Sequence, residues 1–180
     1  MAQLTPLWTQ NPTRDTDTIT AFLAQRDIAY ERWDLPPSVS AIAAKSRLSD
    51  EEKLEVLDTF RAHLNRLAND AGYIDADLIA IRSDFDGIDE ALAKFDKVHY
   101  HDDDEVRAIV GGQGVFGFIG DDGRQFLLTV EAGDYISVPK GMWHWFYCDD
   151  EKNITAIRLF KDSSGWVPHY RSTERGAAAS

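Results

Sequence analysis

The feature that most constrains the fold is the recurrence of short apolar runs separated by turn residues between positions 76 and 160. The runs return about every 8 to 12 residues, which is the spacing of short strands in a β-sandwich or small barrel. One separator, Gly120-Asp121-Asp122-Gly123, is typical of a β-hairpin turn. We therefore expect a mostly β second half.

The preceding part of the chain has a mixed pattern that predicts helices and strands packed on this barrel. Asp17 is expected to cap a helix that carries Ile19, Phe22 and Leu23 on one face. Residues 28–35 have the composition of a strand, which Pro36 would end.

A second helix is predicted after residue 49. Ser49 and Glu52 have the spacing of a capping box, and apolar residues then recur at helical intervals up to a stop near Gly72. These apolar residues are Leu57, Phe60, Leu64 and Leu67. We expect one domain, with a mixed α/β layer over 1–95, a barrel core over 96–170 and a flexible tail over 171–180.

Charge and cysteine content limit the possible partners and cellular compartment of the protein. The net charge of −12 disfavours nucleic acid and anionic membranes as partners. The single cysteine, Cys148, allows no intramolecular disulfide and fits a reducing compartment. We see no signal peptide and no apolar stretch of the roughly 18 residues that span a bilayer. A cytoplasmic protein is expected, and a monomer, because nothing indicates a large apolar interface.

Three histidines and one glutamate form the strongest chemical pattern. His99 and His101 lie two residues apart, so on a strand both rings point to the same face. Glu105 shares that parity after the acidic turn at 102–104, and His144 follows far downstream. Together they offer three nitrogens and one oxygen to a metal ion.

The spacing around these four residues matches the two cupin motifs. Gly112 stands at the expected offset after Glu105, and Gly133-x5-Pro139-x-Gly141-x2-His144 forms the second motif. Ala93 stands where the first motif often begins with Gly, and Cys148 where the second often ends with Asn. Neither is a ligand position. The predicted fold is thus mostly β, a cupin jelly-roll barrel with N-terminal helices and strands packed on it.

The donor set indicates a catalytic metal. Imidazole and carboxylate suit Fe, Ni, Mn, Co or Zn, and the site offers no thiolate. Four protein ligands on an octahedral ion would leave two positions for a substrate that binds through two oxygens. His63, beside the apolar stripe of a helix, and His169, near the C-terminus, are expected to be structural or solvated.

Two arginines and several aromatic residues extend the predicted site. Arg107 shares the parity of Glu105, and Arg158 lies on a strand with apolar residues on its own face. Both are expected to stabilise an anionic substrate. Phe95, Phe146 and Trp166 could wall an apolar substrate tail, although such residues alone are more often core.

The chain resembles the acireductone dioxygenases over nearly its whole length. The stretches that carry the resemblance are Tyr30-Glu31-Arg32-Trp33, Gly72-Tyr73, His99-x-His101-x2-Asp104-Glu105-Val106-Arg107, Gly112-x-Gly114-x-Phe116, Gly133-Asp134-Tyr135-Ile136-Ser137-Val138-Pro139, His144-Trp145-Phe146, Thr155-Ala156-Ile157-Arg158-Leu159-Phe160 and Gly165-Trp166.

This resemblance implies specific roles and a specific reaction. His99, His101, Glu105 and His144 match the family's metal ligands, and one Fe(II) or Ni(II) per chain is implied. Arg107 and Arg158 match contacts to the substrate anion, and Phe95, Phe146 and Trp166 match the pocket for its methylthio tail. The implied substrates are acireductone (1,2-dihydroxy-3-keto-5-methylthiopentene) and O2, in methionine salvage. The iron form would give 2-oxo-4-methylthiobutanoate and formate, and the nickel form 3-methylthiopropanoate, formate and CO.

Two other interpretations remain open at this level. One is a non-enzymatic cupin that binds a metal or ligand as a sensor or store. The intact ligand set and the inward arginines argue against it. The other is a different cupin enzyme, such as an isomerase or another enediol- or ring-cleaving dioxygenase. The stretches around Arg107 and Arg158 favour acireductone over these.

Overall fold

Ten strands and five helices make up the part of the chain that the computed structural model describes, residues 1–161 and 167–172. The strands are β1 (Gln3–Pro6), β2 (Ala29–Arg32), β3 (Asp75–Ile81), β4 (His99–Tyr100), β5 (Glu105–Ile119), β6 (Gln125–Glu131), β7 (Asp134–Val138), β8 (His144–Tyr147), β9 (Ile154–Phe160) and β10 (His169–Tyr170). The helices are α1 (Thr16–Ala24), α2 (Pro37–Ala43), α3 (Asp50–Thr59), α4 (Arg61–Ala71) and α5 (Ile88–Phe95).

The long strand β5 organises the barrel because it pairs with strands on both of its sides and along its whole length. Its second half joins the order β1-β6-β5-β8-β4-β10. Its first half pairs with β7 and β9, which in turn pair with β2 and β3. Every pairing is antiparallel. The expectation of a mostly β protein is confirmed.

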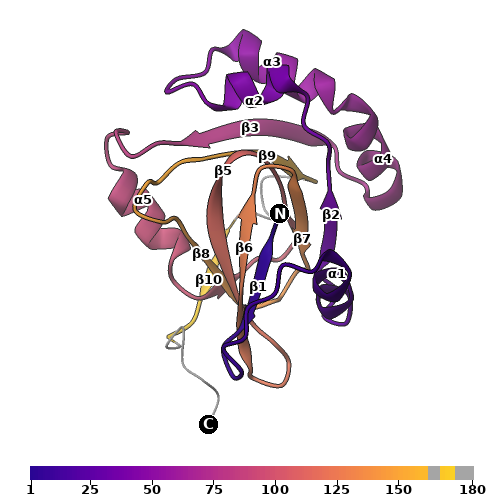
Figure 1. Ribbon diagram of the computed structural model, residues 1–180, viewed down its shortest axis with the longest axis vertical. Helices are drawn as coiled ribbons and strands as arrows, with labels where there is room; N and C mark the ends of the chain where they lie inside the picture. The colour runs from indigo at the N-terminus through magenta and orange to yellow at the C-terminus, as the bar shows by residue number, and fades with distance from the viewer. Residues whose placement is uncertain (162–166, 173–180) are drawn as a thin grey trace.

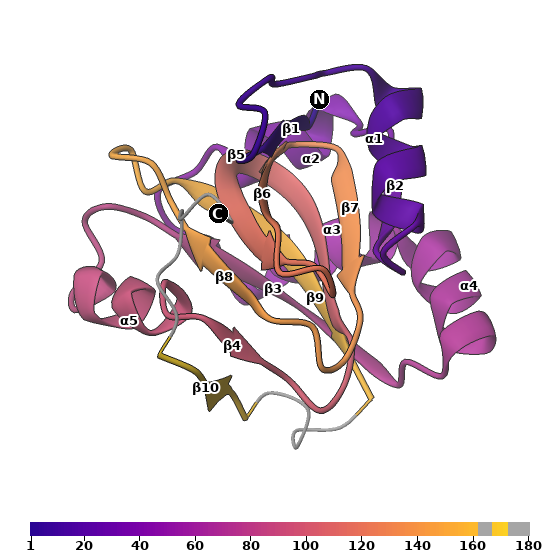
Figure 2. The ribbon, with the colours of Figure 1, turned by 90° about the horizontal axis from the view of Figure 1, so that it is seen from below.

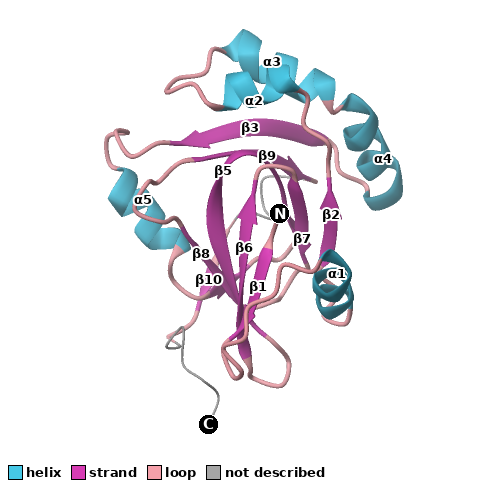
Figure 3. Cartoon of the chain, viewed as in Figure 1, coloured by secondary structure: helices cyan, strands magenta, loops and turns pink. Residues whose placement is uncertain are grey.

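Strand β3 separates the helices from the barrel interior. In Figures 1 and 3, α2 and α3 lie across the outer side of β3, and β9 and β5 lie beneath it. Alternation along the strand gives its two faces different roles. Leu78 packs in a core cluster with the helices, whereas Ile79 and Ile81 line a cavity on the barrel side.

The first helix begins at a different cap from the one expected. Asp15, not Asp17, accepts a hydrogen bond from the Thr18 amide at 2.8 Å, and Asp17 lies in the first turn. Both acidic residues suit the positive end of the helix dipole, so composition alone does not separate them. Ile19 and Leu23 are buried as predicted.

The second predicted helix is two helices. The capping box of Ser49 and Glu52 opens α3 as expected, and Gly72 ends α4 in the left-handed conformation. The helix breaks at Phe60, whose ψ of 15° departs from helical geometry. Phe60 is buried in one cluster with Leu57 and Leu64, so the break lets both helices reach the same core.

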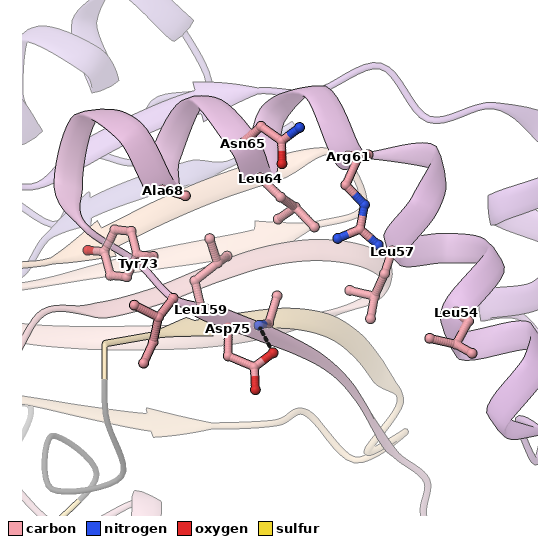
Figure 4. Close-up of a pocket in the computed structure, with 11 residues that line it drawn as sticks. Leu54, Leu57, Arg61, Leu64, Asn65, Ala68, Tyr73, Asp75 and Leu159 are labelled. Carbon is pink, nitrogen blue, oxygen red and sulfur yellow. Dashed lines mark hydrogen bonds between the residues drawn. The ribbon is translucent and has the colours of Figure 1, made fainter.

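A crevice opens between α3, α4 and the start of β3. Figure 4 shows Leu57, Leu64 and Leu159 directed toward it, with Arg61 and Asp75 nearby. It lies on the helix side of β3 and contains none of the three histidines or the glutamate singled out above. Within the described residues, no helix has both the length and the apolarity needed to cross a membrane.

Candidate metal centre

The three histidines and the glutamate come together where β4, β8 and the start of β5 meet. His99 on β4 pairs directly with His144 on β8, and Figure 2 shows these strands side by side. His101 follows β4, and Glu105 is the first residue of β5. One donor atom from each residue can be chosen so that all four lie within 4.8 Å of one another.

Backbone carbonyls fix two of the imidazole rings. Nδ1 of His99 lies 2.6 Å from the Lys97 carbonyl, and Nδ1 of His144 lies 2.8 Å from the Met142 carbonyl. A carbonyl only accepts, so each Nδ1 carries a proton, and Nε2 is the ring nitrogen left to face the other residues of the cluster. Burial, helped by the nearby His144, lowers the pKa of His99 to about 4, so His99 is neutral at physiological pH.

The Glu105 carboxylate lies between two of the rings and an arginine. Its Oε2 is 3.1 Å from His144 Nε2 and 3.0 Å from His101 Nε2, and its Oε1 is 3.3 Å from Arg107 Nη2. Burial alone would raise the pKa of this carboxyl. The Arg107 guanidinium and hydrogen bonds with both rings outweigh burial and hold the pKa well below its usual range. Glu105 is therefore ionised.

This arrangement fits a divalent metal. Nε2 of His144 and Nε2 of His101 both lie within 3.1 Å of the same Glu105 oxygen, so the possible donor atoms converge on one point, as the ligands of a metal ion do. Three imidazoles and one carboxylate suit first-row metals. Nδ1 of His101 is buried, and it has no hydrogen-bond partner within the described residues.

Tight packing between β5 and β8 places His144. Phe118 on β5 pairs with His144, and the preceding pair is Gly117 with Trp145. A Cβ at Gly117 would lie 2.0 Å from the indole ring of Trp145, so only glycine lets the two strands approach this closely. The fully buried Trp145 in turn anchors β8 in the core.

A cavity extends from Glu105 into the barrel. Arg107 and Arg158 line its polar part. Its apolar lining comes from β3, α5, β5, β8 and β9. These residues are Ile79, Ile81, Phe95, Ile109, Phe116, Phe146, Ile154 and Ala156. The cavity thus combines a metal-binding edge, two cations and an apolar end.

The two arginines face each other across neighbouring strands. Arg107 on β5 pairs with Arg158 on β9, and Arg158 pairs on its other side with Asp77 on β3. The Arg107 side chain is only 17% exposed. Burial lowers the pKa of this guanidinium, Glu105 opposes that effect, and Arg158 adds to it. The placement of both arginines in the cavity agrees with the strand parity in the sequence.

The structure places the other residues considered for the site in different surroundings. Phe146 lines the cavity from β8. Phe95 also lines it, as the last residue of α5, and it is 46% exposed. Trp166 lies outside the described residues. His63 stacks on Trp33 at 4.3 Å, and His169, on β10 beside β4, pairs with Asp102; neither belongs to the four-residue cluster.

The sequence reasoning missed the contribution of β3. Asp77, Ile79 and Ile81 reach the cavity region from this strand. Their alternation with Leu78 is visible in the sequence, but the sequence does not show that this strand pairs with β9. That register alone brings Asp77 to Arg158.

An antiparallel barrel that gathers three histidines and a glutamate into one cluster defines a metal-binding cupin. A family model described as ARD/ARD' family matches residues 14–168. The chain belongs to this family and is a metal-dependent dioxygenase.

Several named proteins are similar over most of their length. An acireductone dioxygenase of Leptospira interrogans is 46% identical over 159 residues, which cover 88% of this chain and 89% of that protein. One from Geobacillus kaustophilus is 43% identical, with 85% and 86% covered. A solved structure, described as acireductone dioxygenase from Bacillus anthracis with cadmium ion in active center, matches with a TM-score of 0.88. It is 36% identical and covers 94% of this chain and 98% of that one.

Proposed function

We propose that this protein cleaves acireductone, 1,2-dihydroxy-3-keto-5-methylthiopentene, with O2 in methionine salvage. With Fe(II) the products are 2-oxo-4-methylthiobutanoate and formate. With Ni(II) they are 3-methylthiopropanoate, formate and carbon monoxide. The protein acts in the cytoplasm as a monomer with one metal ion per chain.

The observation that carries this proposal is the shared position of Glu105. It belongs both to the histidine cluster and to the cavity that holds Arg107 and Arg158. A substrate with two adjacent oxygens and a negative charge can therefore meet the metal and the cations together. The names of the relatives support the choice of acireductone among such substrates.

In this proposal His99, His101, Glu105 and His144 hold the metal. The bound ion supplies a Lewis acid and a template for the two reactants. The Lys97 and Met142 carbonyls keep the Nε2 atoms of His99 and His144 directed at it. The low pKa of the Glu105 carboxyl keeps that ligand ionised.

The cavity residues bind and orient the organic substrate. Arg107 and Arg158 stabilise the enediol as an anion, and Arg107 is the less screened of the two because only 17% of its side chain is exposed. Phe95, Phe146 and Trp166 contact the methylthio tail, together with the aliphatic lining from β3 and β9. No protein nucleophile is required, because the electron-rich substrate itself reacts with O2.

Product analysis tests the proposal. Acireductone and O2 are mixed with protein loaded separately with Fe(II) and Ni(II), and with metal-free protein as control. We expect formate and the keto acid to form faster with Fe(II) than in the control, and carbon monoxide to form with Ni(II). Rates and products equal to the control in both forms would refute the proposal.

A further inference from the structure

Asp77 holds one of the two cavity arginines in a two-point ion pair. Nε of Arg158 donates to Oδ1 of Asp77 at 2.8 Å, and Nη2 donates to Oδ2 at 2.5 Å. The two residues are directly opposite each other on β3 and β9. Contact through two atoms fixes the plane of the guanidinium as well as its position.

The ion pair is poorly explained as a source of stability. The side chains of Arg158 and Asp77 are 23% and 40% exposed, and solvent screens pairs of this kind strongly. β3 is also an edge strand, paired only with β9 among the described strands. The pair is therefore expected to contribute little to the stability of the fold.

Asp77 has a clearer role in the charge pattern of the cavity. Arg107 and Arg158 are paired across β5 and β9, and like charges in this arrangement repel each other. Each arginine has its own carboxylate, Glu105 for Arg107 and Asp77 for Arg158. Glu105 lies on β5 with Arg107, and Asp77 lies on β3 on the other side of β9, so each guanidinium has a negative charge beside it that lessens the repulsion between the two.

Metal binding is expected to affect the two carboxylates differently. Glu105 belongs to the metal cluster, and a bound metal would share its charge. Asp77 lies two strands away on β3 and is not part of that cluster. The ion pair between Asp77 and Arg158 can therefore persist when a metal binds, whereas the attraction between Glu105 and Arg107 is then weakened.

We propose that Asp77 is a positioning residue that keeps the Arg158 guanidinium oriented toward the substrate anion. The inference rests on the proposed function. Asp77 does not itself touch the substrate. It acts by fixing Arg158 and by offsetting the repulsion between Arg158 and Arg107.

A double-mutant cycle tests this role. Asp77→Asn keeps the size of the side chain and removes its charge, and it is measured in the wild-type and Arg158→Ala backgrounds. We expect Asp77→Asn to lower kcat/KM about 10-fold to 100-fold in the wild type, and to change it less than twofold when Arg158 is absent. Asp77→Glu, which restores the charge, should recover part of the loss. Anaerobic titration with acireductone should show weaker binding by Asp77→Asn without any turnover.

Asp75→Asn is the matched control. It removes the same charge from the same strand, but its carboxylate accepts a hydrogen bond from the adjacent Ala76 amide and lies at the crevice on the helix side. It should leave kcat/KM unchanged. Metal content and melting temperature are measured for every variant, and Asp77→Ser replaces Asp77→Asn if the latter does not fold.

The outcomes separate the two proposals. The positioning role would be wrong if Asp77→Asn lowered kcat/KM equally in both backgrounds, or if it left kcat/KM unchanged in the otherwise wild-type enzyme while that enzyme is active. Either result would leave the proposed function standing. A metal-loaded wild type that is no faster than its metal-free control would overturn the proposed function, and this inference with it.

Discussion

Adding one methyl group at Gly117 is expected to disturb the metal centre through the core. The new Cβ would lie 2.0 Å from the Trp145 ring, so the ring has to retreat by about 1.4 Å to reach 3.4 Å, where ordinary contact begins. Trp145 is 1% exposed and packs with Val98 and Ile119, and protein cores of this kind are close-packed, so the ring cannot move without moving its neighbours. Strand β8 must then shift, and His144 with it.

The expected cost follows from overpacking. Forcing an extra methyl group into a filled core costs about 1–3 kcal/mol, which for a chain of this size lowers the melting temperature by about 2–12 °C. Because His144 precedes Trp145, Gly117→Ala should also weaken metal binding about 10-fold to 100-fold. Thermal unfolding by circular dichroism measures the first effect, and competition with a chromophoric chelator measures the second.

Gly120→Ala provides a matched control in the same part of the chain. There the closest atom to the new Cβ is Asp122 Oδ1 at 2.9 Å, on an exposed side chain that can move at the cost of one exposed hydrogen bond with the Arg124 amide. Its stability should stay within about 0.5 kcal/mol of wild type. If Gly117→Ala matched this control, or lost stability with unchanged metal affinity, the proposed coupling between Trp145 and His144 would be wrong.

Three further predictions use other parts of the structure. Arg107→Ala should lower kcat/KM about 100-fold with metal content retained, because it removes a cation from the cavity and no ligand; full activity would contradict its role. Tyr30→Phe removes a 2.7 Å buried hydrogen bond to Asp134 and should cost about 1.5–3 kcal/mol in urea unfolding with normal turnover, so an unchanged unfolding midpoint would count against it. Burial raises the pKa of the Cys148 thiol from 9.0 to about 11. Alkylation at pH 8 should be about 100-fold slower than for free cysteine and rise about tenfold per pH unit. Since the native thiol holds its proton more tightly than the unfolded one, stability should fall as the pH rises from about 9 to about 11.

The sequence was most informative where a site depends on local spacing. His99, His101 and Glu105 lie within seven residues of one another, so a short turn between two neighbouring strands is enough to bring them together. Strand parity placed Arg107 and Arg158 in the cavity, because both lie in regular strands.

The sequence was least informative where the arrangement depends on distant segments. Phe95 reaches the cavity from the end of α5, a short helix that strand parity could not anticipate. Asp77 meets Arg158 only through the register of β3 on β9, which joins segments about 80 residues apart. The break at Phe60 likewise reflects a shared core and not local helix propensity.

Isotope labelling tests the central claim most directly. Fe(II)-loaded protein is mixed with acireductone under ¹⁸O₂, and the ¹⁸O content of each product is measured. The rate of product formation is corrected for spontaneous oxidation with a metal-free control. Cleavage of a carbon–carbon bond by one O2 predicts one labelled oxygen in formate and one in the carboxylate of the keto acid, both formed faster than in the control. Label that appears in water or hydrogen peroxide, or a rate no higher than the control, would contradict the account.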